Sequence, residues 1–185
     1  MSQLPSDCLS EIIEYLDNDI VSLHSCLLVN RLWCEVSVRI LWRSIYNYNE
    51  RTYNTLISCL PNESKEISRN NGVVTSILTS KSPMFNYAAF CKVLSVNEIY
   101  DQIYDHKLFF SLQNFNNYNI NTLMQEILKL YMSQIISLKN LVFKYPLNVN
   151  FTSYPGAKDC LKNLSGLDCT TDIFFTNYLK FATIA

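Results

Sequence analysis

The sequence has little glycine, little proline and little charge, and each shortage excludes a class of protein. Only three glycines and five prolines occur in 185 residues, which excludes a collagen-like or linker composition. Charged residues make up 17% and hydrophobic residues 49%, so the chain is not of the disordered kind that buries too little apolar surface to fold. No uncharged apolar run reaches the roughly 18–20 residues that a membrane helix needs. The length suits one ordinary domain, or a small domain and part of another.

The net charge of −1 gives no electrostatic reason to expect a polyanionic partner. Residues 1–45 carry three basic and six acidic residues, and the other 140 carry twelve and ten. Neither part is a charged tail, and binding to phosphates requires clustered Lys and Arg. The sequence therefore predicts neither nucleic acid nor a membrane as a partner.

Seven cysteines are present, but their spacing does not indicate a metal site. No two of them form a C-x-x-C pair, so there is no zinc half-site. Their number is odd, and the N-terminus lacks the basic region of a signal peptide. We expect free thiols in a reducing compartment, the cytoplasm or nucleus, and no metal or cofactor.

Three short amphipathic helices are predicted at the N-terminus, over 5–16, 20–29 and 31–43. Apolar residues recur on one face of each at helical spacing. Asp19 and Asn30 stand where N-caps are expected. Leu9, Ile13 and Leu27 are expected to form plain core between the helices, and Trp42 to close it.

A core of three short helices is too small to be stable by itself. Leu28 and Val29 widen the apolar stripe of the second helix almost all round, so this helix is expected to be buried on two sides. We therefore expect the three helices to dock against the rest of the chain, a partner, or both.

The middle of the chain is predicted to be mainly helical. Asn62 is the expected N-cap of one helix, and residues 108–120 are aromatic and rich in Asn and remain unassigned. The predicted helices are 50–60, 62–70, 86–95 and 97–106, with a loop over 71–85.

The C-terminal part alternates between helical and strand-like segments. A helix is predicted over 121–136, and the tetrapeptide Leu-Lys-Asn-Leu occurs at 138–141 and again at 161–164, each time before a short apolar strand. A last helix is predicted over 172–182. The spacing of about 23–26 residues is typical of leucine-rich repeats. Two units are too few to be stable, so the chain is expected to be a fragment or truncated form of a longer repeat protein.

Residues 4–43 carry several short motifs in a fixed order. The run opens with Leu-Pro and an acidic residue, Asp7. It contains a Leu-Val-Asn-Arg-Leu-Trp hexapeptide at 28–33 and closes with Leu-Trp-Arg at 41–43. No single motif is specific, but together, in this order and at this spacing, they resemble an F-box, in which Glu is commoner than Asp at the position of Asp7. The resemblance covers about a fifth of the chain.

The resemblance implies a three-helix module that binds the Skp-family adaptor of Skp–cullin–F-box (SCF) ubiquitin ligases. Leucine-rich repeats often follow this module and bind the protein substrate. By resemblance, eight residues would lie on or just behind the surface that faces the adaptor: Leu4, Pro5, Ile12, Leu16, Leu23, Val29, Trp33 and Leu41.

We therefore predict a mainly α protein with an F-box domain at 1–45, a helical linker region at 46–120 and a partial leucine-rich-repeat-like segment at 121–185. The predicted function is non-catalytic: a substrate-recognition subunit that binds the adaptor, through it cullin, and an unidentified protein substrate. The alternative is a scaffold or truncated decoy that binds the adaptor and delivers no substrate.

A third hypothesis, a hydrolase with a catalytic cysteine, has little support. No Cys, Ser or Thr stands in a recognisable nucleophile motif. A lone His24 on an apolar helix is typical of a structural residue, and the adjacent Asp105 and His106 point different ways on a helix. We expect no catalytic residues.

Overall fold

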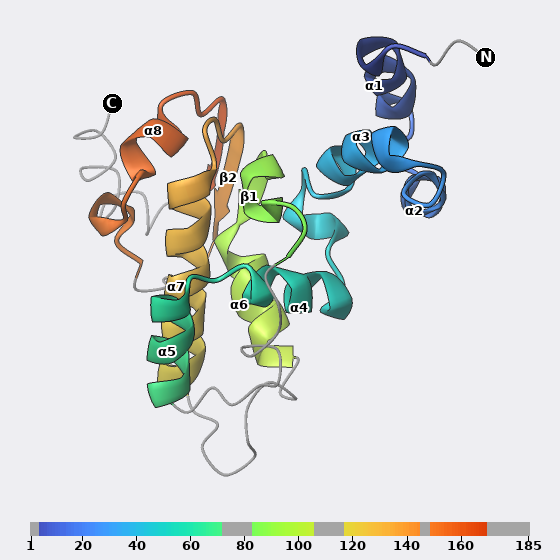
Figure 1. The fold of residues 1–185 in the computed structure, drawn as a ribbon. Coiled ribbons are helices and arrows are strands. Elements are labelled where there is room, and N and C mark those ends of the chain that lie inside the picture. Colours follow the sequence, from blue (N-terminus) through green and yellow to red (C-terminus); the bar gives the residue numbers. More distant parts are fainter. Residues whose placement is uncertain (1–3, 72–82, 106–116, 145–148, 170–185) are drawn as a thin grey trace.

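The structure, a computed structural model, describes residues 4–71, 83–105, 117–144 and 149–169. Within these ranges the protein has eight α-helices and one small parallel sheet, which confirms the mainly α class (Figure 1). In chain order the elements are α1 (Ser6–Glu14), α2 (Ile20–Cys26), α3 (Arg31–Leu41), η1 (Ile45–Asn47), α4 (Glu50–Ser58), α5 (Asn62–Asn70), η3 (Tyr87–Phe90), β1 (Val93–Ser95), α6 (Val96–Asp105), α7 (Asn117–Gln134), β2 (Asn140–Phe143), η5 (Phe151–Ser153), α8 (Ala157–Leu161) and β3 (Gly166–Cys169). Among the described residues, no helix is both long enough and apolar enough to cross a bilayer.

The first three helices lie where the sequence predicts them, each two or three residues shorter at its C-terminal end. The Asp19 carboxylate accepts a hydrogen bond from the Ser22 N–H at 3.0 Å, and the Asn30 side chain accepts one from the Trp33 N–H at 3.0 Å. Both predicted N-caps are thus confirmed, and each satisfies a donor that the first turn of a helix leaves free.

These helices pack through the apolar faces expected of them, because α3 contacts both α1 and α2. Leu9 and Ile13 of α1 and Leu23 of α2 are fully buried, while Leu27 is half-buried against the same core. The prediction that Leu9 and Ile13 are plain core is confirmed.

In the middle of the chain, helices α4, α5 and α6 confirm three of the predicted helices. Asn62 is not an N-cap as predicted. The helix α5 already begins at Asn62, Pro61 occupies the cap position, and no side-chain capping bond forms. A proline suits that position because it has no N–H to satisfy.

The helix predicted over 86–95 is wrong: this stretch forms η3 and the strand β1. The apolar spacing of Tyr87, Phe90 and Leu94 is helical, but tertiary hydrogen bonds decide the conformation. The N–H groups of Lys92 and Val93 both donate to the carbonyl of Arg43, at 2.7 and 3.0 Å. Parallel pairing with β2 then holds residues 93–95 in the sheet.

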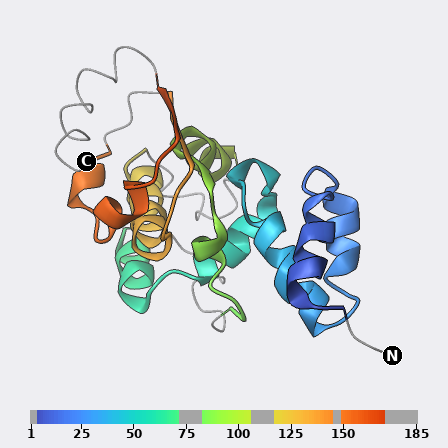
Figure 2. The same cartoon turned by 90° about the horizontal axis from the view of Figure 1, so that it is seen from above.

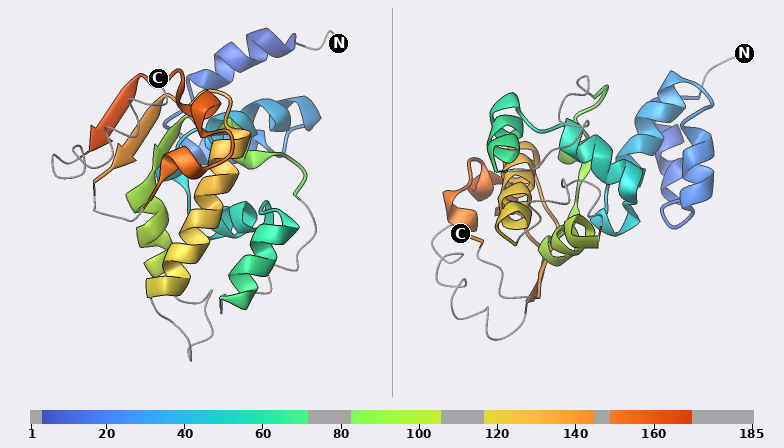
Figure 3. Two further views of the ribbon diagram at one scale, coloured as in Figure 1. Left: turned by 90° about the vertical axis from the view of Figure 1, so that its left-hand side faces the viewer. Right: turned by 90° about the horizontal axis from the view of Figure 1, so that it is seen from below.

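The strands predicted after the Leu-Lys-Asn-Leu segments are confirmed as β2 and β3, and the helix predicted over 121–136 as α7. The sheet has the order β1-β2-β3 with parallel neighbours, side by side in the left view of Figure 3. A leucine-rich-repeat solenoid is not shown. The predicted helix 172–182 lies outside the described residues.

The two Leu-Lys-Asn-Leu tetrapeptides are not structurally equivalent. They are 23 residues apart, whereas the register pairs Asn140 with Gly166 and Leu141 with Leu167, an offset of 26. Leu161 therefore ends α8 instead of occupying the position of Leu138. The structural counterpart of Leu138 is Leu164, three residues later.

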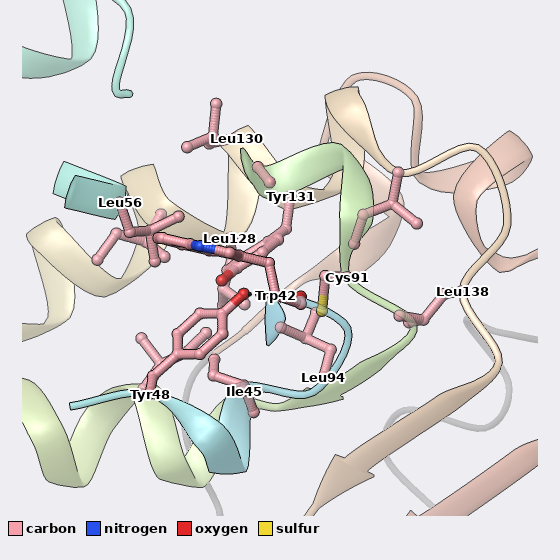
Figure 4. Close-up of a cluster of buried hydrophobic side chains, with 14 of the residues drawn as sticks. Trp42, Ile45, Tyr48, Leu56, Cys91, Leu94, Leu128, Leu130, Tyr131 and Leu138 are labelled. Carbon is pink, nitrogen blue, oxygen red and sulfur yellow. Dashed lines mark hydrogen bonds between the residues drawn. The ribbon is translucent and has the colours of Figure 1, made fainter. Parts of the chain in front are cut away.

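A single cluster of buried apolar side chains runs from α1 to α8, through all three of the predicted segments. At its centre the Trp42 ring packs on Tyr48 and Tyr87, with ring centroids 4.8 and 4.4 Å apart. The Tyr48 hydroxyl donates to the Trp42 carbonyl at 3.0 Å, and Tyr131 of α7 lies beside them (Figure 4). Trp42 therefore joins the N-terminal helices to the rest of the core. The domain boundaries at 45 and 120 stay a prediction.

The helices α1 and α2 project at one end of the molecule, away from α5, α7 and α8 (Figures 1 and 2). The helix α3 links this end to the rest of the molecule, because it contacts α1 and α2 and also η3. This arrangement leaves most of the surface of α1 and α2 open to a partner.

Candidate protein-interaction site

Large exposed apolar side chains concentrate in the N-terminal helices. Of the thirteen in the described part of the chain, seven fall within residues 4–29. We call these seven the exposed apolar group: Leu4, Ile12, Tyr15, Ile20, Val21, Leu28 and Val29. Scattered exposed apolar residues are normal, so the large share that falls in this short stretch makes it a candidate interaction surface.

The exposed apolar group exists because α1 and α2 each have more apolar residues than one buried face accommodates. On α1, Ile13 is fully buried while its neighbour Ile12 is 53% exposed, because adjacent helical residues point about 100° apart. Ile12 and Tyr15 are three residues apart and share the opposite side. Tyr15 is 91% exposed and Leu28 is 88% exposed.

The eight residues predicted to face the adaptor fall into three classes of burial. Leu4, Pro5, Ile12 and Val29 are exposed and available for contact. Leu16 and Trp33 are half-buried, packed against the core with one side open. Leu23 and Leu41 are buried and lie behind the surface. Their contact with an adaptor stays a prediction.

Sequence reasoning missed the most exposed members of the exposed apolar group: Tyr15, Val21 and Leu28. It also expected Leu28 to be buried on the second side of its helix, whereas α2 ends at Cys26 and Leu28 lies in the turn that follows. The sequence signal that could have found these residues is an apolar residue directly next to one that packs on the core. Leu28, for example, follows Leu27.

Five acidic residues lie in the same stretch of chain as the exposed apolar group, and two of them have a lowered pKa. Hydrogen bonds from the side chain and backbone of Ser22 lower the pKa of Asp19. The hydrogen bond from Arg43, opposed by partial burial, lowers the pKa of Glu14. The Arg43 guanidinium binds Glu14 with both nitrogens and lies 3.6 Å from the Asp17 carboxylate. The N-terminal helices therefore combine exposed apolar side chains with carboxylates, of which Glu14 and Asp17 are paired with Arg43.

The described residues offer no support for the cysteine-hydrolase hypothesis. Burial raises the pKa of Cys59 and of Cys160 to about 11, the direction opposite to activation of a nucleophile. His24 is exposed on α2, and His106 lies outside the described residues. No group of three potential metal ligands occurs within the described ranges.

The geometry of the N-terminal region agrees with a comparison against protein families. Residues 1–48 match the F-box-like family model. They form an F-box-like domain. Domains of this family are typically non-catalytic components that bind an adaptor, so the match indicates an adaptor-binding role. No curated protein and no solved structure matches the chain.

The F-box-like domain extends one element, η1, beyond residues 4–43, which carry the resemblance. It includes Trp42, which packs into the common core, and η1, which begins at the buried Ile45. Ser44 forms an isolated parallel bridge with Val93 of β1. The end of the domain is thus built into the edge of the sheet.

Proposed function

We propose that this protein is a substrate-recognition subunit of an SCF ubiquitin ligase. The F-box-like domain binds the Skp-family adaptor, and through the adaptor the chain is joined to cullin. The observation that carries the proposal is the exposed apolar group, seven large side chains left open within the stretch that matches the family.

The energetics of the proposed contact come from burial of apolar side chains. Removing apolar surface from water contributes about 25 cal/mol per Å². A few large anchors dominate such interfaces, and the exposed Tyr15 and Leu28 are free to serve as anchors, with the open side of the half-buried Trp33. Leu23 and Leu41 act indirectly, by holding α2 and α3 in place.

We propose that residues 121–185 bind a protein substrate as a leucine-rich-repeat-like segment. The parallel strands β2 and β3 with the short helix α8 between them support this reading, because one strand and one helix make up such a unit. The chain then acts by proximity: it holds the substrate beside the catalytic partner of the ligase, which raises the effective concentration.

Reconstitution of the ligase from purified components tests the proposal. The full chain is mixed with adaptor, cullin, ubiquitin and the activating and conjugating enzymes, and ubiquitination of its own lysines is followed by mass spectrometry. We expect cullin-dependent modification of the wild type and none of Leu28→Glu. Adaptor binding without any ubiquitin transfer would favour the scaffold or decoy instead.

The proposed site of action is the cytoplasm or nucleus. All seven cysteines are free thiols, which suits a reducing compartment. Imaging of the tagged full chain in its own cells tests this, and accumulation in the secretory pathway would contradict it.

A further inference from the structure

A groove crosses the boundary between the F-box-like domain and the rest of the chain. It has a volume of about 480 Å³, within the range of pockets that hold ligands. One wall consists of five residues between Leu27 and Glu35, at the end of α2 and along α3. The other wall is Met84 and Phe85, which follow the domain by more than thirty residues. We call this the α3 groove.

Aromatic packing fixes the second wall against the first. The Phe85 ring meets Tyr87 edge to face with centroids 5.7 Å apart, and Tyr87 packs on Trp42 at the end of α3. The Arg39 guanidinium of α3 lies 5.7 Å from the centre of the Phe90 ring. Contacts near both ends of the segment 85–90 therefore hold the second wall of the α3 groove against α3.

The α3 groove has an apolar interior and a charged border. Met84 is 76% exposed, and Leu27 is followed directly by the exposed Leu28 and Val29. Arg31 and Glu35 form an i, i+4 ion pair of 2.9 Å along the α3 wall. An apolar stripe with charge beside it is complementary to an amphipathic helix, which binds such grooves through residues at i, i+3 and i+4.

We propose that the α3 groove is a second part of the adaptor-binding surface, into which the adaptor inserts the apolar stripe of a helix. This inference rests on the proposed function and adds that recognition extends past residue 48 to Met84 and Phe85. Its basis is continuity: the groove begins at Leu27, and the exposed apolar group ends at Leu28 and Val29. A methionine in this position can adapt its shape to the inserted side chains.

The first test compares the affinity of three full-length proteins for the purified adaptor by calorimetry. Met84→Glu places a charge in the groove and is expected to weaken binding at least tenfold. Met84→Leu keeps an apolar side chain there and is expected to bind within twofold of wild type. Because Met84 is exposed, neither substitution should disturb the fold, which circular dichroism checks.

The second test observes Met84 directly by NMR of methionine methyl groups in the wild-type chain. Only four methionines are present, and Met124 and Met132 are buried in α7. The signal that disappears in Met84→Leu is assigned to Met84. Adding unlabelled adaptor is expected to shift this signal and to leave those of Met124 and Met132 in place.

The outcomes separate this inference from the function on which it rests. Adaptor binding that Leu28→Glu abolishes and Met84→Glu leaves unchanged, with an unmoved Met84 signal, overturns the α3 groove proposal alone. Absence of binding by the folded wild type overturns both proposals.

Discussion

Arg43 and Glu14 form a bidentate ion pair that joins the first helix of the F-box-like domain to the residues that follow its third helix. One guanidinium nitrogen of Arg43 lies 2.7 Å from Glu14 Oε2, and the other binds Oε1. The carbonyl of the same Arg43 accepts hydrogen bonds from the N–H groups of Lys92 and Val93. One residue therefore connects α1, the end of α3 and the strand β1.

Replacing Glu14 by Gln is expected to lower the free energy of unfolding at pH 7 by less than about 1 kcal/mol, because the pair is partly exposed. Arg43 lowers the folded-state pKa of Glu14, so its stabilising contribution is present above the unfolded value of about 4.3. That contribution is lost as the pH falls through the folded pKa. Urea unfolding at several pH values measures the effect.

We expect the free energy of unfolding of Glu14→Gln to be slightly lower than that of the wild type at pH 7 and equal to it at acidic pH. Glu11→Gln, the same change at an exposed position of α1, is the matched control for the loss of a carboxylate. A deficit of Glu14→Gln that persists at low pH would contradict a role of its charge.

The neighbours Ile12 and Ile13 provide a matched pair, since one is 53% exposed and the other fully buried. Ile13→Ala is expected to cost about 2–5 kcal/mol of folding free energy, the range for large-to-small changes in a core. Ile12→Ala is expected to change stability by less than about 0.5 kcal/mol and to weaken adaptor binding. Chemical denaturation and calorimetry on both variants measure the two effects. Equal loss of stability in the two would contradict the described packing of α1.

Gly156 is the one described residue whose backbone requires glycine, with φ of +79° at the start of α8. A Cβ at this position would lie 2.6 Å from the carbonyl oxygen of Met132. Gly156→Ala is therefore expected to destabilise the protein by more than about 1 kcal/mol, measured by urea unfolding. Gly166→Ala is the control: its Cβ would meet the end of the Asn140 side chain, which can move. A larger loss of unfolding free energy in Gly166→Ala than in Gly156→Ala would contradict the requirement for glycine at position 156.

Thiol reactivity should follow burial. Cys8 is exposed on α1, whereas burial raises the pKa of Cys59 and of Cys160 to about 11. Brief treatment with iodoacetamide at pH 8, followed by peptide mass spectrometry, should label Cys8 first and Cys59 and Cys160 only after unfolding. Rapid labelling of Cys160 in the native protein would contradict the packing of α8.

The sequence predicts the F-box-like helices well because their signals are local. The caps Asp19 and Asn30 act within three residues, and the stripe of Leu9 and Ile13 is buried by neighbours close in the chain. The strand β1 has no comparable local signal. Its conformation is set by Arg43, about fifty residues earlier, and by β2, which follows it by more than forty.

The interaction site is only partly predictable for a similar reason. Family resemblance predicts that Ile12 and Val29 lie on or just behind the surface that faces the adaptor, and both are exposed. An apolar residue next to the buried face of a helix is buried only if another part of the fold packs on it. The exposure of Tyr15, Val21 and Leu28 therefore appears only in the structure. The α3 groove is likewise invisible in the sequence, since Met84 lies far along the chain from Leu27.

The central claim, that the exposed apolar group binds a Skp-family adaptor, is tested most directly by calorimetry with the full chain. Leu28→Glu removes an 88% exposed apolar residue of the group, and Ile136→Glu makes the same kind of change at an 82% exposed position just beyond α7. We predict that the wild type and Ile136→Glu bind the adaptor equally and that Leu28→Glu, with unchanged circular dichroism, does not bind. Absence of binding by the folded wild type, or equal binding by Leu28→Glu, would contradict the claim.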